Sequence, residues 1–575
     1  MNTLNRIVSR NRIHPFFIAA ILGVLATGCA TYQQQNKAIS FWQRGDLTNA
    51  VVEATKKADT KTNSVDAVIW RLEQASVLRA NGQYEDSNKA FDQAQGKIDD
   101  YAQKAKVSIT RETGAMLSNQ ARLPYRGRSY DGIMLNTYKA LNYIALGEPD
   151  NARPELIRAY ERQQDAVEDN KKRIEKSKAD LSNQEQANRE LVGKIQANST
   201  FQSKIDSASS ELDNLKPYAD YVNPFTVYLD GLFFMANAAD ASDLERAHKS
   251  FERISTFLSD DAYIKQDLTA VDDLMNGKPL TPTTYVIFET GCAPVRDQIR
   301  IDIPTFWPQL PYLGAAFPRM QLQPNYLPGL TVTANSPIVT ANEIIVAVTN
   351  TVTATNDIVA TVTNTVTVTN DTVVTTTNAV ATTNDIVGTV TNTVIAANDI
   401  VTTVTNTIIT TNDIVTTITN TVAVPDDKKA TTELLASMDS IIGLDFKNEL
   451  PTVITKTLIS TAIKATATHF AWEATRQKRQ DGTLDNGGIA GALILISASV
   501  YQAANNIADE RTWTTLPKQF QFCRFPTPPD RKIELDTPDG IQKIPLTVGD
   551  GTINIIYVKS ISPGAPLLVT QMKLK

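Results

Sequence analysis

The residue types that most often act as nucleophiles or metal ligands are scarce in this sequence. Among 575 residues there are three cysteines and three histidines, and His248 and His469 fall on segments with helical periodicity. The G-x-S-x-G, P-loop, G-x-G-x-x-G and H-E-x-x-H motifs do not occur. The 62 acidic residues offer many carboxylate pairs, so a hydrolase stays an alternative, but nothing in their spacing selects one pair. We therefore predict that the protein is not an enzyme and binds no metal or cofactor.

The first cysteine ends a segment that is typical of a lipoprotein signal peptide. Residues 1–14 carry three arginines and no acid, and an apolar run of roughly ten residues follows, too short to span a bilayer. The run closes on Ala26-Thr27-Gly28-Cys29, which resembles the bacterial lipobox, although the usual leucine stands one place early, at Leu25. We expect residues 1–28 to be a lipoprotein signal peptide and the Cys29 sulfur to carry lipid; the alternative is an ordinary signal peptide with an incidental cysteine.

The residue after Cys29 bears on the destination of the chain. It is Ala30 rather than aspartate, which by resemblance to the sorting rule of enteric bacteria favours the outer membrane over the inner one. We therefore expect an outer-membrane protein that is lipid-anchored and faces the periplasm. In that oxidising compartment Cys292 and Cys523 are candidates for a disulfide. The alternative is two buried free thiols.

One segment combines residue types that suit binding. Residues 123–132, LPYRGRSYDG, precede a helical segment and contain an arginine and tyrosine cluster. Its members are Tyr125, Arg126, Arg128, Tyr130 and Asp131. Arginine and tyrosine side chains suit a carboxylate or a peptide of a protein partner, so we predict a partner-binding site here. The alternative is a capped, salt-bridged loop.

The elements that must position these residues differ between the two halves of the chain. Small Ala, turn Gly and large aromatic residues recur over residues 29–276 at spacings typical of tetratricopeptide (TPR) repeats, with Gly45, Gly82 and Gly147 at the turns. This pattern predicts a TPR-like α-solenoid, against the alternative of an ordinary helical bundle. Residues 160–216 are dense in mixed charge with a thin apolar seam, which predicts a long helix or helical hairpin that projects as an arm. That arm is either a solvated face or a coiled coil that docks a partner.

The second half reads as a mixed β-sheet and helix module over 283–340 and 426–575. Alternating, β-branched segments are separated by Pro and Gly, and two helical stretches lie between them. The fold class we predict is therefore α+β and multidomain. Residues 487–508 contain an apolar run of about 13 residues, which we interpret as a buried helix and not as a membrane span.

A tandem insert interrupts this module at 342–425. Six copies of a 14-residue unit rich in Thr, Val and Asn make up the insert, and no Lys or Arg occurs between Arg319 and Lys428. Val or Ile recurs every seventh residue, which favours a heptad helix of coiled-coil type because the column then stays on one face. The composition instead suits strands, so a β-solenoid with one copy per rung and a disordered spacer stay open. Self-association through this insert is a further expectation.

Several segments together carry a family resemblance. They are the lipobox, YKALNYIALGE (138–148), VIFETG, IRIDIPTF, PYLGAAFPRM (311–320), DFKNELPTVITKTLISTAIKATA (445–467) and RTWTTLPKQFQ (511–521). With them the chain resembles an uncharacterised family of bacterial outer-membrane lipoproteins with TPR-like repeats. The resemblance implies no known activity and suggests a role in envelope or peptidoglycan biogenesis.

The balance of basic and acidic residues bears on which class of partner the protein binds. With 56 basic and 62 acidic residues the net charge is −6, which gives no reason to expect nucleic acid. We expect a non-catalytic, lipid-anchored envelope protein that binds or scaffolds another periplasmic or outer-membrane protein. The alternatives are an oligomeric accessory of secretion or polysaccharide export and an unrecognised envelope hydrolase.

Overall fold

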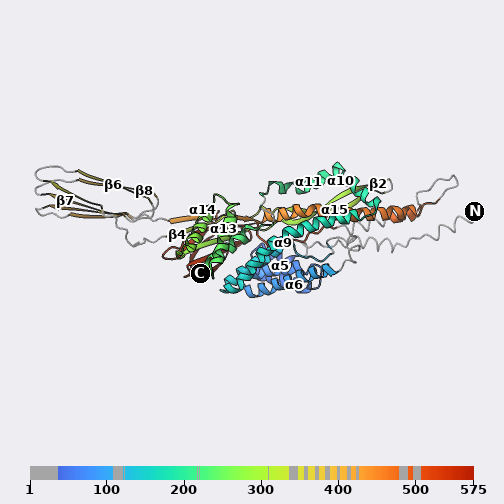
Figure 1. The fold of residues 1–575 in the computed structure, drawn as a ribbon, viewed down its shortest axis with the longest axis horizontal. Helices are drawn as coiled ribbons and strands as arrows, with labels where there is room; N and C mark the ends of the chain where they lie inside the picture. The colour runs from blue at the N-terminus through green and yellow to red at the C-terminus, as the bar shows by residue number, and fades with distance from the viewer. Residues whose placement is uncertain are drawn as a thin grey trace, which may run out of the picture. The chain divides into compact units, whose positions relative to one another are not determined.

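The structure is a computed structural model. It describes residues 36–107, 121, 123–216, 218, 221–307, 310–335, 348–354, 361–369, 374–382, 389–397, 402–410, 416–422, 427–477, 488, 490–495 and 507–575. The predicted signal peptide, residues 1–28, and the predicted lipid-attachment residue Cys29 lie outside the described residues. The described chain is α+β, as expected, and Figure 1 shows its helices and strands.

The chain divides into two compact units. The larger unit takes in the described residues of Met1–Gly329, Thr432–Arg524 and Asp550–Lys575, and the smaller unit those of Leu330–Thr431 and Phe525–Gly549. This differs from the predicted boundary between residues 276 and 283. The reason is that helices from the first half and strands from the second half share one apolar core, so no boundary separates them.

Antiparallel helix pairs build the first half of the larger unit. The pairs are α3 (Lys37–Trp42) with α4 (Leu47–Thr60), α5 (Ala67–Ala80) with α6 (Tyr84–Val107), α8 (Ser129–Ala145) with α9 (Pro149–Ser182), and α12 (Pro224–Ala236) with α13 (Ala241–Ser255). The helix α14 (Ala262–Met275) follows α13. Gly45, Gly82 and Gly147 stand at the turns of the first three pairs with φ of +74°, +77° and +74°. Only glycine adopts this left-handed backbone at no steric cost, so the predicted turn positions are confirmed.

A five-stranded sheet provides the surface on which these helices pack. Its order is β12 (Glu433–Ser437), β13 (Gln519–Pro526), β1 (Thr283–Thr290), β16 (Ile553–Ser560) and β17 (Leu568–Lys573). The strands β1 and β16 are parallel neighbours, with Thr283 opposite Ile553, although they lie far apart in the sequence. The ring of Phe225 on α12 stacks on Phe520 of β13 at 3.8 Å between centroids. Contacts of this kind make the helices and the sheet a single core.

A second, smaller core surrounds the long helix α15 (Met438–Glu473). The helices α10 (Gln186–Gln196) and α11 (Ser199–Ser209), the 3-10 turn η4 (Ser210–Asn214) and the hairpin of β2 (Val295–Trp307) and β3 (Leu310–Gln321) lie around it. Figure 1 shows α9 running beside α15. Leu191, Ile195 and Ile205 of the predicted apolar seam are buried here, against strand residues such as Phe317. The predicted arm is therefore helical; the part of its apolar seam on α10 and α11 is covered by this chain's own strands and helix, whereas Val167 on α9 is exposed.

The smaller unit contains the tandem repeat and a four-stranded sheet. That sheet has the order β11 (Asp427–Thr431), β4 (Thr331–Asn335), β14 (Lys532–Asp536) and β15 (Lys543–Thr547). The described parts of the repeat are six strands: β5 (Val348–Ala354), β6 (Thr361–Thr369), β7 (Val374–Thr382), β8 (Thr389–Ala397), β9 (Thr402–Thr410) and β10 (Thr416–Val422). The preferred heptad helix is therefore wrong. The composition of the repeat explains why strands form there instead, because β-branched Thr, Val and Ile favour strands over helices.

The register of these strands explains the seven-residue column. Strand β5 pairs in parallel with β7, and β7 with β9, so that Val352 lies opposite Val380 and Val380 opposite Ile408. Strand β6 pairs in parallel with β8 in a separate sheet, with Val366 opposite Val394. Each residue of a parallel pair is thus matched with its equivalent two copies further along the chain. The structural period of the repeat is twice its sequence period.

Among the described helices, none is long and apolar enough to serve as a membrane span.

Candidate functional site

The predicted partner-binding cluster lies at the N-terminus of α8, and four of its five members face inward. Tyr125, Tyr130 and Asp131 are buried, and the Arg128 side chain is 7% exposed, whereas Arg126 is exposed. The Asp131 carboxylate accepts hydrogen bonds from the Tyr125 hydroxyl at 2.5 Å and from the Arg128 backbone N–H at 2.8 Å, which caps the helix. Burial raises the pKa of Asp131 to about 6, against these two hydrogen bonds.

Arg128 belongs to an internal ion network that joins distant parts of the larger unit. Its guanidinium donates to Glu449 of α15 at 2.5 Å, and Arg296 of β2 donates to the same carboxylate oxygen at 2.7 Å. Burial by itself would raise the pKa of Glu449, but the two arginines hold it far below the usual range. Asp509 lies 3.7 Å from Arg128 and 2.7 Å from Arg511. The Arg128 charge is thus paired within this chain and Asp131 caps α8, an arrangement that resembles the capped, salt-bridged alternative, while Arg126 stays exposed.

The 511–518 segment, which has no helix or strand, is buried against the helices α5, α6 and α8. The Trp513 side chain is fully buried, with its ring 5.8 Å from that of Phe91 on α6 and 5.9 Å from that of Tyr138 on α8. Its indole Nε1 donates to Ser76 Oγ at 2.9 Å. Glu73 of α5 accepts a hydrogen bond from the Thr514 backbone N–H at 2.7 Å. This part of the stack is therefore covered by a segment of the chain itself.

Among the described residues, Cys292 and Cys523 are free thiols and no disulfide joins them; Cys523 is buried and Cys292 only partly so. Cys523 is fully buried in β13, close to the backbone of Val286 in β1. Cys292 lies beyond the other end of β1, where its Sγ donates to the Ile561 carbonyl at 3.7 Å. Strand β1 therefore separates them, since residues in a strand advance about 3.3 Å each. Burial raises the pKa of both thiols.

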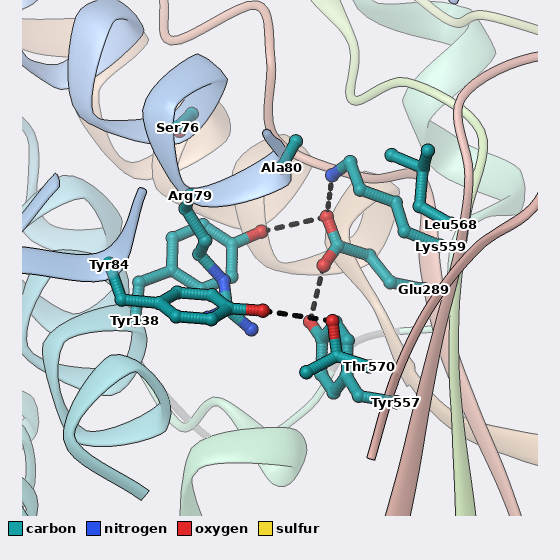
Figure 2. Close-up of a pocket in the computed structure, with 10 residues that line it drawn as sticks. All are labelled: Ser76, Arg79, Ala80, Tyr84, Tyr138, Glu289, Tyr557, Lys559, Leu568 and Thr570. Carbon is teal, nitrogen blue, oxygen red and sulfur yellow. Dashed lines mark hydrogen bonds and ion pairs between the residues drawn. The ribbon is translucent and has the colours of Figure 1, made fainter. Parts of the chain in front are cut away.

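A polar pocket lies where the helical stack meets one end of the five-stranded sheet, and Figure 2 shows it. We call it the Arg79–Glu289 pocket. The strand face that packs on the helices is apolar at Tyr285 and Ile287 and becomes charged at Glu289. The neighbouring strand changes in the same way, and Lys559 lies opposite Glu289 in register. The pocket encloses about 380 Å³ of empty space, including the solvent at its mouth.

The Glu289 carboxylate is fully bonded inside the pocket. One oxygen accepts from the Tyr138 hydroxyl at 3.0 Å and from the Lys559 ammonium, and the other accepts from the Tyr557 hydroxyl. Figure 2 shows these three groups converging on the carboxylate. Burial raises the pKa of Tyr138 and of Tyr557, and the Glu289 charge adds to that rise. Glu289 is therefore the counter-ion of Lys559, and both of its oxygens already accept hydrogen bonds from groups of this chain.

Arg79, near the C-terminus of α5, is the second cation of the pocket. Its guanidinium lies over the Tyr138 ring at 5.1 Å and over the Tyr557 ring at 4.8 Å. It donates to the Asn142 amide oxygen at 2.7 Å. The mouth carries half-buried side chains, among them Tyr84 and Thr570, whose hydroxyls are 2.9 Å apart. The arrangement offers positive charge and hydroxyl groups, which is chemistry for binding an anion.

Sequence reasoning missed this pocket, although a signal was present. Glu289 and Lys559 are the charged residues that interrupt the apolar strands VIFET and INIIYVKS, and Arg79 ends an otherwise largely apolar helix. A charge at a position that periodicity assigns to the core is a sign of a buried polar site. Among the described residues, no group of three or more His, Cys, Asp and Glu side chains is placed to hold a metal ion.

Comparison with known proteins adds no assignment. A scan against protein-family models finds no matching family, and a search of curated proteins finds no significant match.

Proposed function

We propose that the protein is a non-catalytic, lipid-anchored protein of the cell envelope whose TPR-like helical stack binds another periplasmic or outer-membrane protein. The lipid anchor is Cys29, the chain faces the periplasm from the outer membrane, and the binding serves envelope or peptidoglycan biogenesis. The proposal is carried by one observation, the series of antiparallel helix pairs α3/α4, α5/α6, α8/α9 and α12/α13 that stack against one another. Stacks of this kind commonly present an extended surface to a partner protein.

The surface that we assign to the partner is the part of the stack that the 511–518 segment does not cover. That segment is held by the buried Trp513 and by the bond from Thr514 to Glu73. Two helices of the stack carry exposed apolar side chains, Val52 on α4 at 57% exposure and Val167 on α9 at 46%. Apolar side chains among charged ones are typical of the central part of a binding surface.

Site-specific crosslinking tests this assignment. A photo-reactive amino acid replaces Val52 or Val167 in the full chain, expressed in its own host, and the matched control carries it at Ile541, which is 77% exposed in the smaller unit. We expect one envelope protein to be captured from the stack positions and not from the control. Equal capture at all three positions, or none at Val52 and Val167, would contradict the proposal. A Cys29→Ala chain tests the anchor separately, because it should leave the membrane fraction.

A second candidate function rests on the repeat. The sheet of β10, β9, β7 and β5 ends on β5, and β6 and β8 form a two-stranded sheet. Edge strands carry backbone groups that can pair with a strand of a second copy. This favours an oligomeric accessory protein that self-associates through residues 342–425. Light scattering of the chain with and without 342–425 tests it, since only loss of the oligomer on deletion agrees with this candidate.

A further inference from the structure

The Arg79 guanidinium is a buried cation whose hydrogen-bond partners are neutral. Arg79 is 7% exposed, donates a hydrogen bond to the Asn142 amide oxygen, and lies over the Tyr557 ring. Within the part of the chain that the structure describes, no carboxylate lies within ion-pair distance of it. Glu289, the acid of the pocket, is bonded to the Lys559 ammonium; it acts on Arg79 only at longer range, where its charge, together with Tyr557, raises the pKa of Arg79 against the effect of burial. A buried charge without an ionic partner is costly, so a counter-ion entering the pocket would stabilise it.

The position of Arg79 leaves room for such a counter-ion. The guanidinium lies over the rings of Tyr138 and Tyr557, at 5.1 and 4.8 Å, and Arg79 lines the pocket together with both tyrosines (Figure 2). The pocket beside it opens past Tyr84 and Thr570, which are half-buried and carry hydroxyls that can orient a ligand. We propose that the Arg79–Glu289 pocket binds a carboxylate-bearing ligand, with the ligand's carboxylate as the ionic partner of Arg79.

Charge and shape select a carboxylate among anions. Arg79 and Lys559 contribute two positive charges and Glu289 one negative charge, so the pocket carries one net positive charge. A monovalent anion neutralises it, whereas a doubly charged phosphate would place its second charge beside Glu289 at an unfavourable distance. The planar guanidinium matches a planar carboxylate in a two-bond arrangement. The ligand class is thus a small carboxylate or the carboxylate terminus of a peptide.

Isothermal titration calorimetry of the full chain in detergent tests this inference. The probe is N-acetylglycine, its neutral analogue is N-acetylglycinamide, and inorganic phosphate is the competing anion. We expect binding of N-acetylglycine alone and a loss of affinity of about tenfold or more for Arg79→Gln, because charge-assisted hydrogen bonds are lost. Arg71→Gln is the matched control: Arg71 is as buried and lies on the same helix, but pairs with Asp59 at 2.9 Å. It should bind the probe like the wild type.

Three results would overturn the inference: no heat with N-acetylglycine, equal binding of the neutral amide, or unchanged affinity of Arg79→Gln. Tighter binding of phosphate than of N-acetylglycine would overturn the choice of a carboxylate. If Arg79→Gln does not fold, Ala80→Trp blocks the mouth without removing the cation, and unchanged binding by that variant also refutes the site. Crosslinking from Val52 does not require this ligand, so the inference and the proposed function can fail independently.

Discussion

The 511–518 segment is predicted to be a structural part of the helical stack, and Trp513→Ala is the substitution that tests this most directly. Trp513 lies between α5, α6 and α8, with no exposed surface. Its ring contacts those of Phe91 and Tyr138, and its indole N–H bonds to Ser76. Removing the ring leaves a cavity among three helices and deprives Ser76 of its donor.

The expected loss follows from these contacts. Truncation of a buried Trp to Ala costs about 3–5 kcal/mol, and the lost hydrogen bond about 1 kcal/mol. We expect the free energy of unfolding of the larger unit to fall by about 5 kcal/mol, which for a unit of this size corresponds to a decrease in melting temperature of roughly 5 °C. Trp307→Ala is the matched control, because Trp307 is half-buried at the end of β2 and stacks on His469 at 4.6 Å. A pair of this kind is worth about 1 kcal/mol.

Two measurements on the full chain in detergent check this prediction. Near-ultraviolet circular dichroism gives the melting temperature, and hydrogen exchange followed by mass spectrometry locates the loss of protection. We expect protection to fall in α5 and α8 for Trp513→Ala and to stay unchanged there for Trp307→Ala. If the two variants melt together, or if α5 keeps its protection in Trp513→Ala, the segment does not support the stack and the reasoning is refuted.

Four further predictions concern other parts of the chain. Glu449→Gln removes the carboxylate shared by Arg128 and Arg296, so the free energy of unfolding should fall by about 3–5 kcal/mol. The control is Glu473→Gln, from an i,i+3 surface pair, which should change the free energy of unfolding by less than about 0.5 kcal/mol. Equal effects of the two substitutions in denaturant titrations would contradict this prediction. Burial raises the pKa of Asp131 and of Asp267 from 3.8 to about 6, so the folded state keeps protons that the unfolded state releases between these values. Stability from this source is complete below about pH 4 and declines as the pH rises to about 6; Asp267→Asn should flatten the decline in melting curves taken across this range, and an unchanged slope would refute the assignment. Cys523 should react with a maleimide only after denaturation, and the intact mass should show that Cys292 and Cys523 are both reduced. A mass lower by two hydrogens would instead indicate a disulfide between them. Deletion of 361–388, which removes two copies of the repeat unit, should keep the parallel pairing, whereas deletion of 361–374, a single copy, should place strands in the wrong sheet; equal strand content by far-ultraviolet circular dichroism would contradict the two-copy period.

Much of the helical half follows from local pattern. Gly45, Gly82 and Gly147 mark turns because left-handed backbone favours glycine, and this requirement is local. Small residues such as Ala75 and Ala140 are fully buried, as close helix contact requires. These features depend on a few neighbouring residues, and periodicity therefore recovers them.

The repeat shows where local pattern misleads. A Val or Ile at every seventh residue gives the same sequence pattern whether these residues share one face of a helix or lie on strands that pair two copies apart. Periodicity alone favoured the helix, while β-branched composition favoured strands. The register that places Val352 opposite Val380 joins one copy to the next but one, so it is a property of the pairing and not of any one copy.

The sequence by itself determined the α+β class, the positions of the helix-pair turns and the scarcity of residues suited to metal or nucleophilic chemistry. Only the tertiary structure decided that Arg128 meets Glu449 from 321 residues away, that Trp513 enters the stack, and that Arg79, Glu289 and Lys559 share one pocket. The physical reason is range. Turns and periodicity depend on neighbouring residues, whereas burial, ion pairing and the sign of a cavity's charge depend on which distant side chains the packed core brings together.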